Sequence, residues 1–239
     1  MKKNKNIENL ISLWRVVGQI GGDHLITDRY EMSAVTLSEW PNRIWFDGCI
    51  DRELLEHLSN NYKLKNFTFP LMGESLVHNE EIFRQAEFDL KSLQYGMFKQ
   101  LGGFNLADDR VKVVKVAEPH QAYIWSTLFA AAFGYMIHPQ TVALTMNVVD
   151  YFIGTYEDQP VGTAVLFFSN SDIAGIHSMG IIPEMRMRGF ARNLLLQVLK
   201  IAEHEGAKWA TLQASDSGKA LYKQVGFKEE FIIKNYIKR

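Results

Sequence analysis

Residues 186–191 are the part of the sequence whose residue types and spacing best suit the binding of an anion. They read Arg-Met-Arg-Gly-Phe-Ala, between an apolar run that ends at Pro183 and a long amphipathic pattern. The glycine of this turn, Gly189, lets the backbone come close to a ligand. The first amides of the following helix have no intrahelical acceptor and lie at the positive end of its dipole. We therefore predict a cradle for a phosphate group here.

Such a short pattern is weak evidence by itself, because a glycine that opens a helix is more often ordinary turn chemistry. The elements around it strengthen the prediction. An apolar stripe that includes Leu194 and Val198 predicts a helix that ends near Gly206. Residues 151–156 and 161–168 predict a β-hairpin joined by a polar turn, and residues 173–182 and 209–213 predict two further strands. The helix would therefore cross between two strands.

This order of elements, together with three short motifs, resembles the GNAT superfamily of acyl-CoA-dependent N-acyltransferases over about residues 111–239. The family signature Arg/Gln-x-x-Gly-x-Gly/Ala is met by Arg186, Gly189 and Ala191. The preceding Val-x-Pro is approximated by Ile181, Ile182 and Pro183, and the later Leu-Tyr-x-x-x-Gly-Phe is met by Leu221, Tyr222, Gly226 and Phe227. The resemblance implies an α/β fold with a mixed, mostly antiparallel twisted sheet flanked by helices.

The resemblance also implies where acetyl-CoA, the acyl donor, would bind. A V-shaped split between the strands at 173–182 and 209–213 would hold the pantetheine arm, and the amides of 187–192 would meet the pyrophosphate. Arg186 and Arg188 would add charge, although a solvated basic turn is the alternative interpretation. The residues predicted to bind the cofactor are Ile181, Ile182, Arg186, Met187, Arg188, Gly189, Phe190, Ala191 and Arg192.

Two side chains are candidates for catalysis. The family motif places Tyr222 beside the sulfur of the cofactor, where a phenol can donate a proton to the departing thiolate; its alternative role is a core aromatic residue. The strand at 173–182 lacks the glutamate that many relatives place there, and His177 is its only titratable side chain. Its ordinary pKa near 6.5 suits a general base, whereas a lone strand histidine is more often structural. An acceptor amine that is already neutral would need no base.

A backbone amide near residues 179–181 would be the simplest stabiliser of the oxyanion. Gly180 would permit a bulged strand there, or it would serve only close packing.

Composition restricts the class of protein. The 239 residues carry a net charge of −1 and no long basic run, which does not indicate nucleic-acid binding. The single cysteine, Cys49, excludes an internal disulfide and supplies no metal-ligand spacing, so we predict no metal. No signal peptide and no membrane-spanning run is predicted, and we expect a cytoplasmic enzyme of undetermined oligomeric state.

The chain is longer than one GNAT module needs. A boundary at residues 101–110, rich in glycine and acidic residues, predicts an α/β N-terminal domain at 1–105 and the GNAT domain at 111–239. The first domain is either a degenerate GNAT copy, which would make a tandem GNAT chain, or a cap that shapes the acceptor site; the sequence favours neither.

Three functions remain open at this point. The first is an acetyl-CoA-dependent N-acetyltransferase that acts on a small-molecule or peptide amine. The second is a non-catalytic acyl-CoA-binding sensor or scaffold, which the missing strand carboxylate suggests. The third is a tandem GNAT that transfers an aminoacyl group from a charged RNA, against which the near-neutral charge argues.

Overall fold

The computed structural model of the chain describes residues 2–103 and 110–239. The helices within these ranges are α1 (Lys2–Gly21), α2 (Arg52–Asn61), α3 (Glu74–Gln85), α4 (Pro119–Phe133), α5 (Pro139–Thr145), α6 (Phe190–His204) and α7 (Lys219–Gln224), with short 3₁₀ turns at Leu64–Asn66 and Pro183–Met185. The strands are β1 (Asp23–Ile26), β2 (Glu31–Ala34), β3 (Arg43–Trp45), β4 (Phe69–Met72), β5 (Phe88–Gln100), β6 (Lys112–Lys115), β7 (Asp150–Tyr156), β8 (Gln159–Asn170), β9 (Ile173–Ile181), β10 (Trp209–Ala214) and β11 (Lys228–Lys238).

A large sheet dominates the described part of the chain. Its eight strands lie in the order β4-β11-β5-β10-β9-β8-β7-β6, and β1, β2 and β3 form a separate small antiparallel sheet. In the large sheet β9 and β10 are parallel, because α6 crosses between them, whereas the other neighbouring pairs are antiparallel. The predicted mixed and mostly antiparallel sheet is therefore confirmed.

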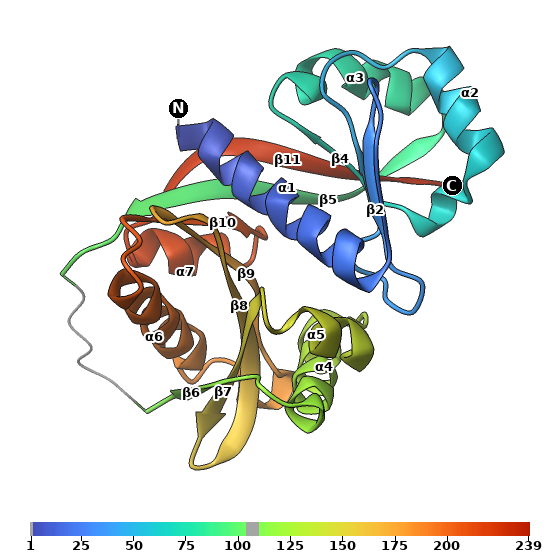
Figure 1. Cartoon of the computed structure of the whole chain (residues 1–239). Coiled ribbons are helices and arrows are strands. Elements are labelled where there is room, and N and C mark those ends of the chain that lie inside the picture. The colour runs from blue at the N-terminus through green and yellow to red at the C-terminus, as the bar shows by residue number, and fades with distance from the viewer. Residues whose placement is uncertain (1, 104–109) are drawn as a thin grey trace.

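The alternation of side chains along β7 and β8 separates two hydrophobic cores. Tyr151 and Val165 belong to the core under α1, α4 and α5, while Phe152 and Leu166 belong to the core under α6 and α7. Figure 1 shows α6 on one side of these strands and α4 with α5 on the other. Helices therefore flank both faces of the sheet, as predicted.

The N-terminal part contributes a third core and two strands of the large sheet. The third core includes Ile44, Leu58 and Phe83, and it lies among β3, α2, α3 and β4. β5 pairs with β10 on one side and with β11 on the other, so the large sheet contains strands from both sides of the predicted domain boundary. The division into 1–105 and 111–239 stays a prediction, and residues 104–109 of that boundary lie outside the described residues.

Most elements expected from the sequence are present. The β7–β8 hairpin turns at Glu157 and Asp158, both with positive φ, as tight hairpins require. Asp51 caps α2, since its carboxylate accepts a hydrogen bond from the amide of Leu54 at 2.8 Å. α3 begins directly after Gly73, which has a positive φ of 62°.

Candidate active site

The pairing of β9 with β10 stops halfway along both strands. Trp209 to Leu212 pair with Ile173 to Ile176, and beyond Leu212 and Ile176 the two strands share no register. Each strand nevertheless continues, β9 to Ile181 and β10 to Ala214. The predicted split between these two strands is therefore present. Along its edges, the backbone N–H and C=O groups of β9 and β10 form no hydrogen bonds with each other.

The turn before α6 has the backbone that a phosphate cradle needs. Met187 and Gly189 both adopt positive φ, 61° and 81°, and α6 begins at Phe190. Within the described residues no backbone acceptor binds the amides of Phe190, Ala191 and Arg192, whereas the amide of Asn193 donates to the carbonyl of Gly189. Three amides at the positive end of a 15-residue helix therefore remain for a ligand.

The cradle residues differ in how their side chains lie. Phe190 is buried in the core, Ala191 is partly buried, and Met187, Arg188 and Arg192 are exposed. Arg188 and Arg192 form no ion pair within residues 2–103 and 110–239, so their charge adds to the positive field of the helix end.

The side chain of Arg186 is held by two backbone carbonyls. Its guanidinium donates to the carbonyl of Ile181 at 3.0 Å and to that of Ala132 at 2.8 Å. This geometry joins the end of β9 to the end of α4 and favours a supporting role over phosphate contact. The amide of Ile182 donates to the carbonyl of Val161, so this amide is not available to a cofactor.

Arg110 lies beside the cradle, although the sequence analysis treated it only as the end of the boundary segment. Its Nη2 atom is 3.6 Å from the position that a Cβ atom at residue 189 would take. Its guanidinium also lies 5.8 Å from the centre of the Phe190 ring. The next amide, that of Val111, is fixed by the side chain of the buried Asn193. An arginine two residues before a strand carries no sequence signal that would have marked it.

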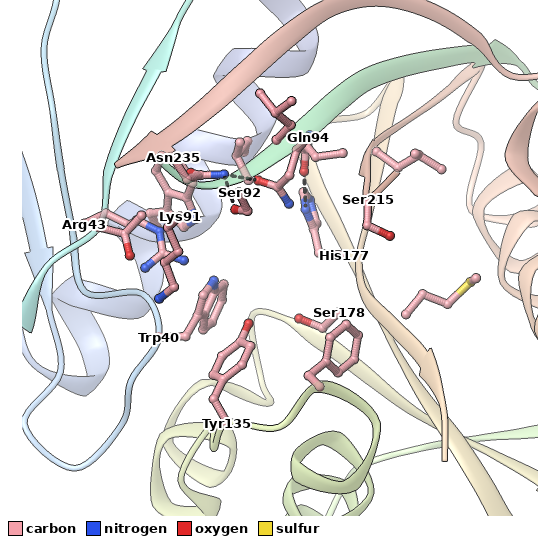
Figure 2. A pocket seen from close by; sticks show the side chains of 18 of the residues that line it. Trp40, Arg43, Lys91, Ser92, Gln94, Tyr135, His177, Ser178, Ser215 and Asn235 are labelled. Carbon is pink, nitrogen blue, oxygen red and sulfur yellow. Dashed lines mark hydrogen bonds between the residues drawn. The ribbon is translucent and has the colours of Figure 1, made fainter. Parts of the chain in front are cut away.

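A cavity of about 590 Å³ opens at the split. Residues of the split and of α7 line one side of it, among them Ser178, Met179, Ser215 and Tyr222. β3, β5 and the loop before β3 line the other side, which Figure 2 shows facing His177, Ser178 and Ser215. The N-terminal part of the chain therefore supplies a wall of this cavity.

Tyr222 lies at the wall of this cavity, and its place beside the sulfur of the cofactor stays a prediction. Its side chain is 9% exposed, and its ring packs against Phe227 with ring centres 6.0 Å apart. Burial raises the pKa of the Tyr222 hydroxyl to about 12, so the group keeps its proton throughout the ordinary pH range. The core and functional interpretations are thus compatible, because the ring packs in the core while the residue lines the cavity.

His177 is held in a buried network of amide side chains. Its Nε2 atom lies 2.9 Å from Oδ1 of Asn9, and its Nδ1 atom lies 3.1 Å from Oε1 of Gln213. Gln213 in turn donates to Asn6 at 2.6 Å. Burial lowers the pKa of His177 to about 4. Both ring nitrogens therefore face amide side chains, and the neutral ring donates from one of them. This arrangement favours a positioning role for His177 over that of a general base.

β9 carries a bulge at the split, but its strained residue is Ser178. Val165 pairs with His177 and Thr163 with Gly180, so β9 contains one extra residue between them. Ser178 has a φ of 48°, which is uncommon for a residue other than glycine and typical of functional sites. A Cβ atom at Gly180 would lie 2.7 Å from the ring of Phe133. Gly180 therefore serves close packing against α4.

Comparison with known proteins assigns residues 117–227 to a family. Residues 117–227 match the family model described as the acetyltransferase (GNAT) family. The segment contains the cradle, the split and Tyr222. Residues 117–227 form a GNAT acyltransferase domain.

The GNAT domain also has a curated relative. An uncharacterized N-acetyltransferase of Chlorobaculum tepidum is 25% identical over 96 residues, which are 40% of this chain and 61% of that protein. The match therefore spans less than two thirds of the relative.

Solved structures show that the fold extends beyond the GNAT domain. A GCN5-related N-acetyltransferase from Kribbella flavida has a TM-score of 0.70 at 13% identity, covering 98% of this chain and 96% of that one. A GCN5-related N-acetyltransferase-like protein from Streptococcus suis has a TM-score of 0.63 at 14% identity and is covered completely. At this identity the likeness concerns the fold alone, and it includes the N-terminal part.

Neither a metal site nor a membrane-spanning helix is present in residues 2–103 and 110–239. No group of three or more histidine, cysteine, aspartate or glutamate residues there could hold a metal ion. Among the described helices, none combines the length and the apolar character needed to cross a membrane.

The burial of His177 predicts a pH-dependent stability. Its pKa is about 4 in the folded chain and near 6.5 in the unfolded chain, so the unfolded state binds more protons between these values. The stabilisation is complete above pH 6.5 and is lost as the pH falls toward 4, by about 3 kcal/mol in total. Urea titrations at several pH values should show this loss. A smaller slope of the free energy of unfolding against pH in His177→Gln than in wild type assigns the loss to this ring. Identical slopes would contradict the assignment.

Gly175 permits the contact between α1 and His177. A Cβ atom at residue 175 would lie 1.8 Å from Oδ1 of Asn9 and 2.4 Å from Nε2 of His177. Gly175→Ala should therefore lower the free energy of unfolding by about 1–3 kcal/mol, because the helix must move away. Gly21→Ala is the matched control, since its new methyl group would meet Thr141 at an ordinary 3.7 Å. Chemical denaturation checks both, and equal stability of the two variants would refute the role of Gly175.

Proposed function

We propose that this protein is an N-acetyltransferase that transfers an acetyl group from acetyl-CoA to an amine bound in the cavity. The observation that carries the proposal is the position of the split. It lies next to the free amides that begin α6, and it opens into a cavity lined by Tyr222. In this proposal the amides of Phe190, Ala191 and Arg192 bind the pyrophosphate, with Arg188 nearby.

The donor, when bound, supplies an activated acetyl thioester. The unpaired edge of β9 would pair with the pantetheine arm, as the family resemblance implies. The backbone amide of Ile181 is suitable for this role. The carbonyl of Ile181 points away from β8, where it accepts a hydrogen bond from Arg186, and the amide of the same strand residue points to the same side. The bulge at Ser178 would aim a neighbouring amide at the carbonyl oxygen of the thioester.

Tyr222 would stabilise the thiolate as the C–S bond breaks and the C–N bond forms. The pKa of its hydroxyl, about 12, lies above the value near 8.5 that is typical of a thiol. Donation of a hydrogen bond is therefore favoured over complete proton transfer. The attacking amine releases one proton to solvent and the thiolate takes up one proton from solvent, so the number of protons is balanced over the reaction.

The chain offers no well-placed base among the described cavity residues. Both ring nitrogens of His177 face amide side chains, and its pKa is lowered to about 4. We therefore propose that the amine enters in its neutral form, or that it loses its proton to water. Such an enzyme would become faster with rising pH until the free amine is neutral.

The test is the release of free thiol from acetyl-CoA in the presence of a panel of primary amines, followed with a thiol reagent. Time-dependent release that requires both an amine and the intact protein supports the proposal. Tight binding of acetyl-CoA without release of thiol for any amine would instead support the sensor hypothesis. Two observations favour that hypothesis: the ring of His177 is held by amide side chains, and β9 carries no carboxylate. A cytoplasmic location and the absence of nucleic-acid binding stay predictions.

A further inference from the structure

One side of the cavity is lined by side chains that donate hydrogen bonds. Figure 2 shows Arg43, Lys91, Trp40 and Tyr135 together, facing the split with His177 and Ser178 across the cavity. Within the described residues the indole N–H of Trp40 and the hydroxyl of Tyr135 have no hydrogen-bond partner. Arginine, lysine and tryptophan side chains can only donate. This group of four, the donor wall, is therefore suited to a ligand that accepts hydrogen bonds.

The donor wall is also positively charged. The guanidinium of Arg43 donates a hydrogen bond to the carbonyl of Asn42 at 3.0 Å and lies 5.9 Å from the ring centre of Trp14. Neither Arg43 nor Lys91 forms an ion pair with a carboxylate in the described part of the chain. Burial, and then the charge of Arg43, lowers the pKa of Lys91. Two partly desolvated cations thus lie close together without a direct counterion.

One carboxylate is near enough to offset part of this charge. Glu39 lines the same cavity and acts to raise the pKa of Lys91, although its Oε1 atom accepts a hydrogen bond from the amide of Met136 at 3.2 Å. Two cations and one carboxylate leave a net charge of +1. A singly charged anion matches this balance better than a doubly charged phosphate, and a planar carboxylate suits a guanidinium.

The backbone aims Lys91 at the cavity. Asn235 of β11 pairs with Ser92, and the next residue, Tyr236, pairs with Leu90, so Lys91 is the extra residue of a β-bulge. A bulge interrupts the alternation of a strand and redirects a side chain. The consecutive residues Lys91, Ser92 and Leu93 all line the cavity, which an uninterrupted strand would not allow.

Lys91 of the donor wall lies at a distance from the split. Tyr95 pairs with Ala214 at the end of β10, and Lys91 precedes Tyr95 by four positions on β5. Four positions correspond to about 13 Å of strand. Phe133 and Tyr135 contribute aromatic surface to the lining of this cavity. A ligand that reaches both ends would need an apolar chain between its two polar ends.

We propose that the acceptor is an amino acid derivative or short peptide whose primary amine and carboxylate stand at opposite ends, with the carboxylate bound by Arg43 and Lys91. This inference rests on the proposed function for the position of the amine, which must lie at the split. An ordinary α-amino group does not satisfy it, because only one carbon separates it from the carboxylate. Trp40 and Tyr135 would donate further hydrogen bonds to the same carboxylate.

The experiment compares two acceptors of equal chain length, ε-aminocaproate and n-hexylamine, in the thiol-release assay. We expect kcat/KM to be higher for ε-aminocaproate by about 10-fold or more, because a charge-assisted hydrogen bond has that effect. Arg43→Met and Lys91→Met should each reduce this preference while leaving the rate with n-hexylamine unchanged. Lys200→Met, which removes an exposed lysine of α6, is the matched control.

A binding measurement separates this inference from the proposed function. Caproate has no amine, so calorimetry can detect its binding even if the protein transfers nothing. Binding by wild type and Lys200→Met, weakened about 10-fold or more in Arg43→Met and Lys91→Met, supports the carboxylate site whether or not thiol is released. Equal binding by all four proteins, or tighter binding of n-hexyl phosphate than of caproate, overturns it. Circular dichroism establishes that each variant is folded.

Discussion

Gly189→Glu should abolish measurable binding of acetyl-CoA, weakening it by at least about 100-fold. The residue adopts a φ of 81°, which strains any side-chain-bearing residue. A glutamate would also place a negative charge beside the amides of Phe190, Ala191 and Arg192, where the pyrophosphate must approach. Strain displaces the amides and the charge repels the phosphates, so both effects act in the same direction. Isothermal titration calorimetry measures the loss.

Gly206→Glu is the control for this variant. Gly206 has a φ of 90° and open space around its Cα atom, so the substitution adds the same charge and similar strain beyond the other end of α6. Acetyl-CoA should bind to Gly206→Glu as to wild type. If both variants bind equally well, the cradle does not hold the cofactor; if both lose binding, strain or misfolding explains the result instead.

Tyr222→Phe should lower kcat by about 100-fold or more while leaving the affinity for acetyl-CoA unchanged. The substitution keeps the ring that packs 6.0 Å from Phe227 and removes only the hydroxyl. Because the pKa of this hydroxyl is about 12, wild type should show no loss of activity from its ionisation up to about pH 10. Steady-state kinetics across a range of pH tests both statements.

Tyr123→Phe provides the comparison, because Tyr123 lies on α4 with its side chain exposed. That variant should retain full activity. An unaltered kcat in Tyr222→Phe would show that Tyr222 is a core residue and that water or another group stabilises the thiolate.

Local patterns explain why so much of the fold could be predicted. The apolar stripe of α6 and the β7–β8 hairpin each depend on residues close in sequence. The cradle was predictable for the same reason, since Gly189 and the helix start are adjacent. The placement of β5 between β10 and β11 depends on contacts between distant segments, which no local pattern records.

The parts of the site that were not predicted arise from tertiary structure. Ser178 has no property that announces a positive φ, and its strain is imposed by the bulge in β9. The occupation of His177 requires Asn9 of α1, 168 residues away. Arg43 and Lys91 are ordinary surface residue types in the sequence, and only the tertiary structure brings β3 and β5 to one cavity.

The most direct test of the central claim is an amide NMR spectrum of the labelled protein, recorded with and without one equivalent of acetyl-CoA. We expect the largest shifts at the amides of residues 187–192 and along the end of β9, and no shifts in α2. Such a pattern would support acetyl-CoA as the ligand of the cradle and of the split. Unchanged amides at 187–192, with or without shifts elsewhere, would contradict the account.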